Sequence, residues 1–430
     1  MKKLNTSPIS GMQELLPARQ VLFNKYKREI EEVYHRHGFL SIETPVIDRA
    51  EILFAKAGGE TEKQIYKVVK TEESADSADQ ALRFDHTVPL ARYVAEHESD
   101  LSFPFKVTQI GRNFRGERAQ KGRFREFYQC DIDVIGRGEL SLAYDAEVIA
   151  TLFEAVCGLG LKALVRISNR KILSGLLEAL NLNHLTKEIL SIIDHAEKVP
   201  EDVTAQKLAD LGIGEEYVVK ITTFMNIAGG MEVLEKLVEF GVENETFAKG
   251  LEELSEVCKD LSEQGLSDNL RIDMKIVRGL DYYTGTVFET IIPDYKQIGS
   301  VCSGGRYDNL ASLYTDQLLP GVGGSIGLTR LFFAMSEFGL AKTDTQAPLD
   351  VAVVPIDKLQ NSYAQRIALK LRKNNKLVDV VLTDKKLGDK LKYASKVAKY
   401  GVVIGDDEVR TGELLAKNFE TGEKIRLADL

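Results

Sequence analysis

Apolar residues recur at helical spacing over residues 18–37, and Gly38 follows at the position where a helix C-terminal cap belongs. This pattern predicts an amphipathic helix over residues 18–37. The next segment, residues 39–45, favours a strand, and its last residue, Pro45, suits a sheet edge or a strand end. The chain therefore opens with a helix followed by a strand at the border of a sheet.

Residues 103–135 have the pattern of a long antiparallel hairpin with arms at 103–114 and 124–135. Side chains alternate between the two faces of a strand. In the second arm, one face would carry Tyr128, Cys130, Ile132 and Val134, and the other would carry Phe127, Gln129, Asp131 and Asp133. An amide and two carboxylates on one face are unusual against an apolar core, so this face is predicted to floor a polar pocket.

Shorter elements are predicted on both sides of this hairpin. Residues 71–80 are small and polar and predict a loop, and residues 82–84 favour a short strand. Thr87 is a candidate N-cap for a helix that would run through Ala95. The spacing of apolar residues over 141–156 predicts another helix.

Residues 171–266 have a different texture from their flanks, with Leu and Ile at three- and four-residue spacing and glycine breaks. They predict an inserted helical module. Strand character returns at residues 271–278 and 286–292. Because the strands around 103–135 and 271–292 read as hairpin-like meanders without βαβ spacing, we predict an antiparallel sheet with flanking helices, an α+β fold.

The last part of the chain predicts a separate α/β domain. A glycine-rich stretch, residues 321–327, leads into a predicted helix at 326–338, and a polar linker follows at 343–348. Beyond it, apolar strand patterns alternate with helical patterns, which indicates a compact domain with a mainly parallel sheet. The predicted strands are 351–354, 378–382 and 402–404, and the predicted helices are 359–373 and 387–399.

Composition narrows the class of protein. The 430 residues are 44% hydrophobic and 28% charged, a globular balance for two or three domains. No apolar run approaches the roughly 18 residues of a membrane span, and the amino end lacks the apolar core of a secretory signal. Four separated cysteines fit a reducing cytoplasm, which makes the cytoplasm the expected location.

The net charge of −9 excludes a simple basic coat for nucleic acid, but the charge is uneven. Residues 347–430 contain 16 Lys and Arg against 12 Asp and Glu, a net of +4, which leaves −13 for residues 1–346. A basic terminal domain on an acidic body suits an anionic partner. Chance variation in a lysine-rich surface explains the same counts.

The predicted hairpin tip, residues 112–125, gathers six cations around one acid, Glu117. The cations are Arg112, Arg115, Arg118, Lys121, Arg123 and Arg125. Guanidinium groups bind phosphate in a bidentate manner, so this tip suits a polyanion. A solvated hairpin tip is the plainer alternative. The polar face that follows favours a site for a phosphate together with a ligand rich in N–H groups.

Five segments in order resemble the histidyl-tRNA synthetase family of class II aminoacyl-tRNA synthetases. Residues 114–136 resemble its motif 2, and residues 278–285, RGLDYYTG, resemble its first histidine-specific signature. Residues 303–308, SGGRYD, resemble the second signature, and residues 323–330 resemble motif 3. Residues 38–48 resemble motif 1, which builds the dimer interface in the family. The resemblance covers nearly the whole chain.

The resemblance implies a site for ATP. Arg115 would contact the α-phosphate, Glu117 would help to hold the nucleotide, and Phe127 would stack on the adenine with Arg330 on its other side. Arg278 would approach the α-phosphate and take over work that a metal ion does in relatives. Mg²⁺ is expected to accompany ATP, whereas the six histidines and four cysteines show no metal-ligand spacing, so no resident metal is expected.

The resemblance also implies a site for L-histidine. Asp85, Thr87 and Gln129 would hold its α-ammonium, which needs acceptors. The remaining positions are Asp133 and Tyr283, which would bind the imidazole, Tyr282 and Tyr307, which would line the pocket, and His86, which would touch the site through its backbone. Buried partners for the ring nitrogens would reject amino acids that lack them.

For tRNA(His), the resemblance implies two contact regions. Arg118, Gln120 and Arg123 would lie near the acceptor end, and the helical insertion could lean on the acceptor stem. Residues 1–342 would form the catalytic domain, with the insertion at about 171–266, and residues 347–430 the anticodon-binding domain of a homodimer. Candidate phosphate contacts there are Lys385, Lys386, Lys390, Lys392 and Lys396, although a solvated helix face explains these lysines equally well.

The chain departs from the family pattern at three places. Thr329 stands where motif 3 has an acid, Ala119 stands where the motif 2 loop often has proline, and the chain ends shortly after the third strand pattern of its last domain. The alternatives are the regulatory subunit of ATP phosphoribosyltransferase, a synthetase for proline, threonine or glycine, and an inactive module that senses tRNA. Both histidine signatures, the last domain and the three arginines weigh against them.

Overall fold

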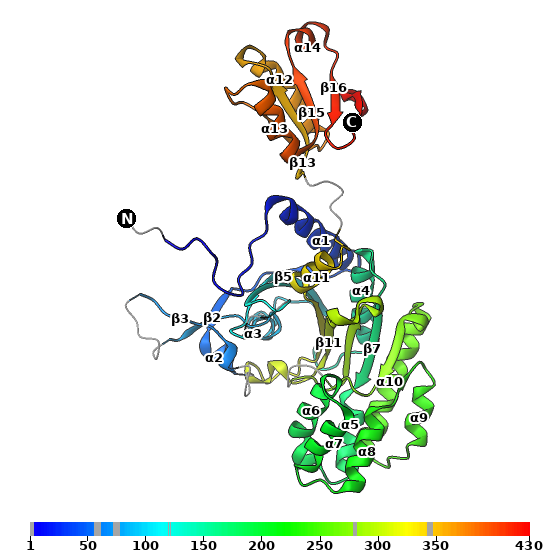
Figure 1. Ribbon diagram of the computed structural model, residues 1–430. Coiled ribbons are helices and arrows are strands. Elements are labelled where there is room, and N and C mark those ends of the chain that lie inside the picture. The colour runs from blue at the N-terminus through cyan, green and yellow to red at the C-terminus, as the bar shows by residue number, and fades with distance from the viewer. Residues whose placement is uncertain are drawn as a thin grey trace. The chain divides into compact units, whose positions relative to one another are not determined.

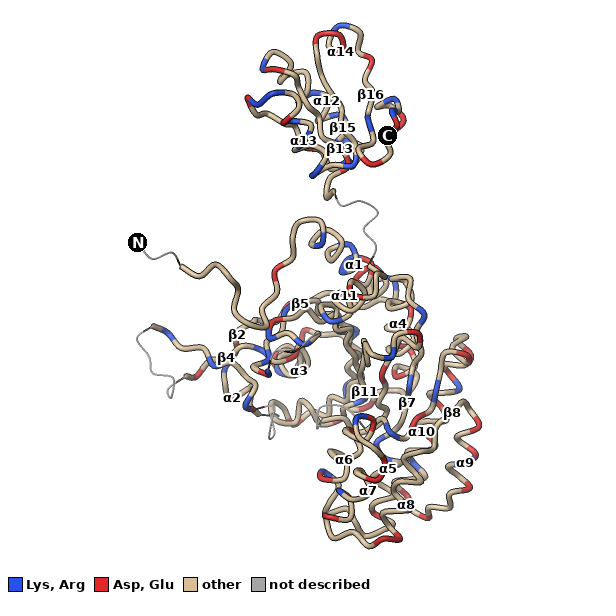
Figure 2. Tube along the Cα trace, viewed as in Figure 1, with Lys and Arg blue, Asp and Glu red and all other residues tan. Residues whose placement is uncertain are grey.

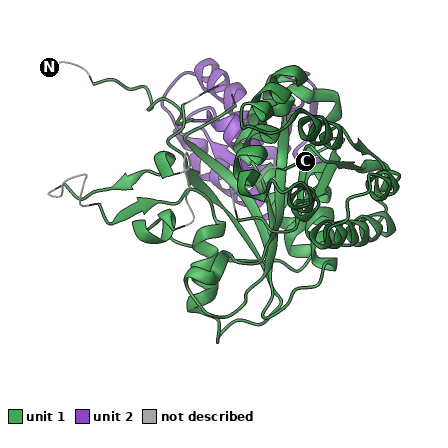
Figure 3. Ribbon diagram, turned by 90° about the horizontal axis from the view of Figure 1, so that it is seen from below, with its two compact units in different colours: residues 1–13, 26–338 green, residues 14–25, 339–430 purple. Residues whose placement is uncertain are grey.

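The computed structural model of the protein describes residues 4–55, 62–71, 78–118, 120, 122–277, 282–341 and 347–430. The chain divides into two compact units (Figure 3). The larger contains residues 1–13 and 26–338, and the smaller contains residues 14–25 and 339–430. Among the described residues no helix is long and apolar enough to cross a membrane.

A nine-stranded mixed sheet forms the centre of the larger unit (Figure 1). In spatial order its strands are β1 (Leu40–Ser41), β5 (Phe105–Phe114), β6 (Glu126–Ile135), β12 (Gly321–Ile326), β11 (Ser300–Tyr307), β10 (Thr286–Ile291), β7 (Leu164–Asn169), β9 (Leu270–Asp273) and β8 (Ala228–Gly229). Neighbours from β5 to β7 are antiparallel, whereas β1 runs parallel to β5 and β9 runs parallel to β7.

The predicted meander over residues 271–292 is wrong, although both strands exist. β9 and β10 are not neighbours, because β7 lies between them and pairs antiparallel with β10 and parallel with β9. A parallel pair needs a crossover of a dozen residues or more. The helical block between β7 and β9 supplies that crossover, so it is built into the sheet's connectivity.

The hairpin prediction is confirmed by β5 and β6, which pair over their full length with Gln109 opposite Asp131 and Gly111 opposite Gln129. The predicted alternation also holds. Cys130, Ile132 and Val134 are fully buried, and the Tyr34 hydroxyl donates to the Cys130 carbonyl oxygen at 3.0 Å. This leaves the polar side chains of β6 on the opposite face, where the cavities described below are found.

Helices cover the sheet and extend the larger unit (Figure 1). The predicted helices at 18–37, 141–156 and 326–338 are α1 (Pro17–Arg36), α4 (Ala143–Gly158) and α11 (Leu328–Glu337). The predicted helical block contains α5 (Arg170–Ala179), α6 (Thr186–His195), α7 (Glu201–Ala209), α8 (Glu215–Met225), α9 (Val233–Glu239) and α10 (Glu245–Glu263). α5 and α10 cross closely, since a Cβ on Gly175 would lie 2.3 Å from the Phe247 backbone nitrogen.

A small three-stranded sheet precedes the hairpin and corrects two local predictions. It contains β2 (Ile47–Arg49), β3 (Lys67–Val68) and β4 (Gln80–Leu82), next to the helices α2 (Ala50–Phe54) and α3 (Thr87–Glu96). A strand was predicted at residues 82–84, but β4 ends at Leu82. The predicted N-cap role of Thr87 is wrong, because Asp85 Oδ1 accepts the Val88 backbone N–H at 3.0 Å and Thr87 is the first helical residue.

Residues 347–430 form the predicted α/β fold, with two further strands. β13 (Leu349–Pro355) pairs parallel with β14 (Val378–Val380) and β15 (Ala398–Ile404), and β16 (Leu415–Asn418) and β17 (Lys424–Arg426) continue the sheet antiparallel. The helices are α12 (Asn361–Lys373), α13 (Leu387–Val397) and α14 (Asp406–Thr411). Val351 and Val353 pack in one apolar cluster, and Ala352 and Val354 pack in another.

One lysine predicted to contact phosphate in this fold is buried instead. Lys390 is 3% exposed, and its Nζ donates to the carbonyl oxygens of Pro355, at 2.9 Å, and Ile356, at 3.2 Å. A side chain committed to two carbonyl groups inside the domain does not reach RNA, so this prediction is wrong. Lys385, Lys386, Lys392 and Lys396 are exposed.

Candidate active site

Two adjoining cavities are lined by residues of β6, β11 and β12. The smaller has a volume of about 180 Å³ and the larger about 280 Å³. Arg115, Gln129, Ser303 and Ser325 line both, so the two spaces meet at these side chains. An arginine at the junction of two pockets can contact a ligand in each, which is the geometry needed to join two substrates.

The smaller cavity has an acidic inner end. The Tyr307 hydroxyl donates to Asp133 Oδ1 at 2.7 Å, and both side chains are buried. Burial raises the pKa of Asp133 to about 8, although the hydrogen bond from Tyr307 acts in the opposite direction. Burial also raises the pKa of Asp85, against the Val88 hydrogen bond and the Arg115 charge. These carboxyl groups suit a ligand that brings its own N–H donors.

Three tyrosines form the wall beside these acids. The Tyr282 and Tyr283 rings meet edge to face with centroids 4.9 Å apart, and the Tyr282 and Tyr307 rings do so at 5.9 Å. Tyr282 is hydrogen-bonded to Thr87, and burial raises the pKa of its hydroxyl well above the usual value. The wall therefore presents neutral hydroxyl groups that can donate or accept.

The floor of the smaller cavity requires a glycine beside Asp133. A Cβ on Gly323 would lie 1.9 Å from Asp133 Oδ1, a distance that no side chain tolerates. Gly323 is paired with Asp133 across β12 and β6. The glycine-rich stretch predicted only as the approach to a helix is thus a strand whose missing side chains make room for the carboxylate.

The larger cavity combines aromatic rings with arginines. The Arg115 guanidinium lies 4.3 Å from the Phe84 ring centroid and 5.0 Å from that of Phe127. Burial lowers the pKa of Arg115, and the charges of Asp85 and Glu117 oppose this effect. Arg330, whose Nη2 donates to the Ile298 carbonyl oxygen at 2.7 Å, lies across the cavity. A planar ring with an anionic tail fits this slot.

The chain is similar to known proteins over nearly its whole length. A family model described as histidyl-tRNA synthetase matches residues 11–331, and a model described as an anticodon binding domain matches residues 350–429. The chain is 47% identical to histidine–tRNA ligase of Clostridium tetani, across 99% of this chain and 97% of that protein.

The chain belongs to the histidyl-tRNA synthetase family.

Solved structures agree with this assignment at the level of the synthetase fold. The crystal structure of histidyl-tRNA synthetase from a Nostoc species is 38% identical, covers 99% of this chain and 98% of that one, and has a TM-score of 0.88. A Bacillus halodurans structure titled ATP phosphoribosyltransferase regulatory subunit/histidyl-tRNA synthetase has a TM-score of 0.77 over 94% of this chain. Its identity of 21% shows a shared fold alone.

Most residues assigned to the synthetase site by resemblance come together. The smaller cavity is lined by Asp85, Thr87, Arg115, Gln129, Asp133, Tyr282, Tyr283 and Tyr307. The larger is lined by Arg115, Glu117, Arg123, Phe127 and Arg330. Their assigned roles in binding histidine and ATP remain predictions, which the shared walls of the two cavities support.

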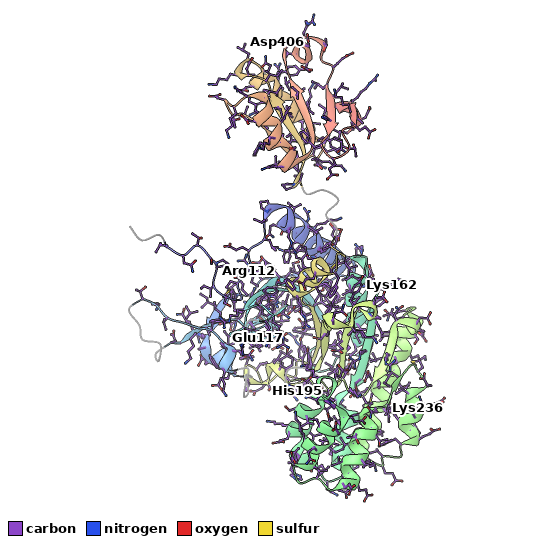
Figure 4. The ribbon with its side chains drawn as sticks, in the orientation of Figure 1. Arg112, Glu117, Lys162, His195, Lys236 and Asp406 are labelled. Atoms are coloured by element: carbon purple, nitrogen blue, oxygen red, sulfur yellow. The ribbon has the colours of Figure 1, made fainter. Side chains whose placement is uncertain are left out.

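Four assigned residues lie elsewhere or outside the described part of the chain. Arg118 and Gln120 are exposed on the hairpin tip and line neither cavity, whereas Arg123 lines the larger cavity and donates to Glu117 Oε2 at 3.2 Å. Glu117 lies in the middle of the larger unit, whereas His195 and Lys236 lie among the insertion helices (Figure 4). His86 is buried and does not line the cavity, and Arg278 lies outside the described residues.

The departure at Thr329 has a structural explanation. Its hydroxyl accepts the Tyr128 backbone N–H at 2.8 Å, and the residue is 7% exposed. Thr329 therefore joins the start of α11 to β6, next to Phe127. Thr329 is not among the described residues that line the larger cavity.

Residue-by-residue assignment missed Ser303, Ser325 and Asp131 as parts of the site. Alternation along β6 had already placed Asp131 on the polar face, so that signal was present. Ser303 and Ser325 lie in the segments that resemble the second histidine signature and motif 3, but a serine in a glycine-rich segment does not by itself indicate which way its side chain faces. They reach the cavity only because β11 and β12 pair next to β6.

Proposed function

We propose that the two cavities divide the work of a histidine–tRNA ligase, with L-histidine in the smaller and ATP in the larger. Membership of the family makes the chain a ligase that charges tRNA(His) with histidine through an adenylate. The observation that carries the assignment of the cavities is their meeting at Arg115 and Gln129. A carboxylate in one space can reach a phosphate in the other only at such a junction.

The smaller cavity has acceptors for both ends of histidine. Asp85, Thr87, Gln129, Asp133 and Tyr283 all line this cavity. The first three are proposed to accept from the α-ammonium, and Asp133 and Tyr283 are proposed to bind the two ring nitrogens. A buried carboxyl and a neutral hydroxyl match an imidazole that donates from one nitrogen and accepts at the other. Ligands without both groups would leave these side chains unpaired, at a cost of roughly 10⁴-fold in selection.

The first reaction step needs positive charge and alignment more than proton transfer. The histidine carboxylate, already ionised, attacks the α-phosphorus of ATP and pyrophosphate leaves. Arg115 would contact the α-phosphate with Arg278, while Phe127 stacks on the adenine beneath Arg330. The aromatic rings at 4.3 and 5.0 Å from Arg115 support this placement, because they hold the guanidinium at the junction of the cavities.

Mg²⁺ would enter with ATP and supply charge to its phosphates. Glu117 is the only carboxylate among the described residues that line the larger cavity. Magnesium bound to a nucleotide commonly keeps several waters and takes one or two protein carboxylates. This donor set therefore fits a metal ion carried by the substrate, with Glu117 as its candidate protein ligand.

The second step transfers histidine to the 3′-hydroxyl of the terminal ribose of tRNA. Arg118, Gln120 and Arg123 are proposed to meet the acceptor end, which their exposure on the hairpin tip supports. Residues 350–429, which match an anticodon binding domain, are proposed to meet the anticodon. The exposed lysines of residues 385–396 are the candidate phosphate contacts.

The helical insertion is a poor candidate for contacts with RNA phosphates. Residues 171–266 contain eight Lys and no Arg against 19 Asp and Glu, a net of −11. Acidic positions recur along its helices α6, α7, α8 and α9 (Figure 2). Because RNA is a polyanion, this charge argues against the expectation that the insertion leans on the acceptor stem through its phosphates.

A homodimer and a cytoplasmic location complete the proposal. The segment that resembles motif 1 exposes Leu40, Val46 and Ile47 at 66%, 40% and 45%, which is apolar surface of the kind that a partner subunit covers. The cysteines are present as free thiols. Residues 1–342 and 347–430 remain the proposed catalytic and anticodon-binding domains.

The test is histidine-dependent exchange of pyrophosphate into ATP without tRNA, followed by charging of bulk tRNA. Exchange with histidine but not with proline, threonine or glycine, together with charging, is expected. Exchange that follows another amino acid would assign a different synthetase specificity. A folded protein without exchange would support the regulatory or sensing alternative.

A further inference from the structure

A chain of hydrogen bonds joins five side chains at the amino-acid cavity, of which Gln129, Asp131 and Ser325 line the cavity. Asn113 Nδ2 donates to Gln129 Oε1 at 2.8 Å, Gln129 Nε2 donates to Ser325 Oγ at 2.7 Å, and Ser325 Oγ donates to Asp131 Oδ1 at 2.5 Å. His86 Nδ1 lies 3.1 Å from Asp131 Oδ2, to which it donates, and this contact extends the chain to His86. Asn113 Nδ2 lies 3.4 Å from the same nitrogen, which cannot also accept from it.

We propose that Asp131, held by His86, is a positioning residue that sets the direction of these hydrogen bonds and turns the carbonyl oxygen of Gln129 toward the α-ammonium of the amino acid. The proposal rests on the assignment of the smaller cavity to the amino acid. It assigns His86 a role through its side chain, beneath the pocket, in place of a contact with the ligand.

The direction follows from which groups can donate. A carboxylate only accepts, so the single hydroxyl hydrogen of Ser325 points to Asp131. Ser325 Oγ then has lone pairs for Gln129, and the group of Gln129 that faces it is the NH₂ group. The Gln129 carbonyl oxygen is therefore turned the other way, where Asn113 uses one lone pair and the second remains for a donor in the cavity.

An ammonium group is the ligand that this arrangement selects, because it has only donors. With the amide reversed, the NH₂ group of Gln129 would face the ammonium and repel it. The carboxylate of Asp131 thus determines, through Ser325 and Gln129, whether the pocket accepts or rejects the α-amino end. Loss of the Asp131 carboxylate would therefore weaken the binding of ligands that have an ammonium group and leave the binding of ligands without one unchanged.

The buried charge of Asp131 is balanced by cationic and N–H groups. Asp131 and His86 are 4% and 1% exposed. Arg83 lies close by, since a Cβ on Gly111 would be 2.5 Å from Arg83 Nη2 and 3.1 Å from His86 Nε2. Burial lowers the pKa of Arg83, and the Asp131 carboxylate opposes this effect. Arg83 is itself held by the carbonyl oxygens of Arg112 and Thr44, both at 2.8 Å.

The test compares L-histidine with imidazole propionate, which is histidine without its α-ammonium, by calorimetric binding to the full-length protein. The wild-type protein is expected to prefer histidine. In Asp131→Asn the side chain can donate to Ser325, so the ratio of the two dissociation constants should fall about tenfold or more. Binding of ATP should stay unchanged. A merely structural role would weaken both ligands together and leave the ratio constant, which would overturn the proposal.

A second variant guards against an Asp131→Asn protein that does not fold. Ser325→Ala removes the link between Asp131 and Gln129 and leaves the buried carboxylate with His86. The same fall in the ratio is expected. An unchanged ratio in this folded variant would overturn the proposal on its own.

The part played by His86 is tested with a matched pair of variants. His86→Asn keeps an N–H donor near the position of Nδ1 and should retain the wild-type ratio, whereas His86→Leu, of similar size, should lose it. Equal ratios in the two variants would remove His86 from the arrangement. A wild-type protein that shows histidine-dependent exchange while the variants keep the ratio would refute the positioning role alone. Absence of exchange in the wild type would refute the proposed function instead.

Discussion

The two sheets of this protein differ in what their faces meet. β6 of the larger unit carries Gln129, Asp131 and Asp133 on the face that floors the cavities. β13 of the smaller unit carries Val351 and Val353 toward one apolar cluster, and Ala352 and Val354 toward another. A parallel sheet covered by helices on both faces must be apolar on both, whereas a sheet with one face on a ligand cavity need not be.

Because of this difference, we expect residues on the cavity face of β6 to serve function and residues of β13 to serve stability. Buried polar groups on β6 cost free energy unless they are hydrogen-bonded. We therefore expect each of them to bond either to another side chain or to a ligand. Substitutions on that face should change chemistry. In the smaller unit, both faces of β13 pack in apolar clusters, so its substitutions should change stability. The four predictions below test that separation.

The largest effect is expected from Arg115→Ala. Arg115 lies between two aromatic rings at the junction of the cavities, and its loss should slow histidine-dependent pyrophosphate exchange roughly a thousandfold. Arg366→Ala is the matched control, because Arg366 also lies near an aromatic ring, 5.4 Å from Tyr363, but on an exposed turn of α12. Similar rates in the two variants would contradict the role of the junction.

A large loss of stability is expected from Arg306→Met. Arg306 Nη2 lies 2.5 Å from Asp145 Oδ2, and the two side chains are 6% and 0% exposed. Removal of one partner leaves a buried charge and should cost about 3–5 kcal/mol. The loss should appear as a lower unfolding temperature of the larger unit. Arg410→Met, which breaks an exposed pair with Asp407 in α14, should leave unfolding unchanged. Equal shifts would remove the distinction between the pairs.

A smaller effect is expected from Lys392→Ala in the smaller unit. Loss of one phosphate contact should raise the KM for tRNA about threefold and make its salt dependence shallower by about one unit of slope. Lys390→Met should instead lower the unfolding temperature of the smaller unit, because Lys390 is held by carbonyl groups. Pyrophosphate exchange should be normal in both. An unaltered salt slope in Lys392→Ala would show that this face does not bind RNA.

A pH dependence of stability is expected from Asp133. Its pKa is about 8 in the folded protein against an ordinary value of about 4, so folding favours the protonated form. The stability that it contributes is present below about pH 4 and is lost as the pH rises to about 8. Between pH 5 and 9 the unliganded wild type should therefore lose a few degrees more in unfolding temperature than Asp133→Asn. Parallel curves for the two proteins would contradict this assignment.

Local pattern was enough to predict much of the site. The period of two along β6 placed Asp131 and Asp133 on the same face, and the helical spacing located α1 and α4 within a few residues. Resemblance in five ordered segments then assigned the family. These signals work from sequence alone because strand alternation, helix period and motif spacing involve residues that are close together in the chain.

Only the tertiary structure shows which polar side chains are buried and which distant groups they bond to. Arg306 and Asp145 are 161 residues apart in sequence, and Ser325 and Asp131 are 194 apart, yet each pair is in contact. The position of β7 between β9 and β10, the burial of Lys390 and the place of His86 beneath the cavity are of the same kind. The sequence by itself determined which residue types stand on which face of each element. Which distant group satisfies each buried polar atom depended on how those elements pack, because a hydrogen bond or ion pair forms only between groups that the whole fold brings together.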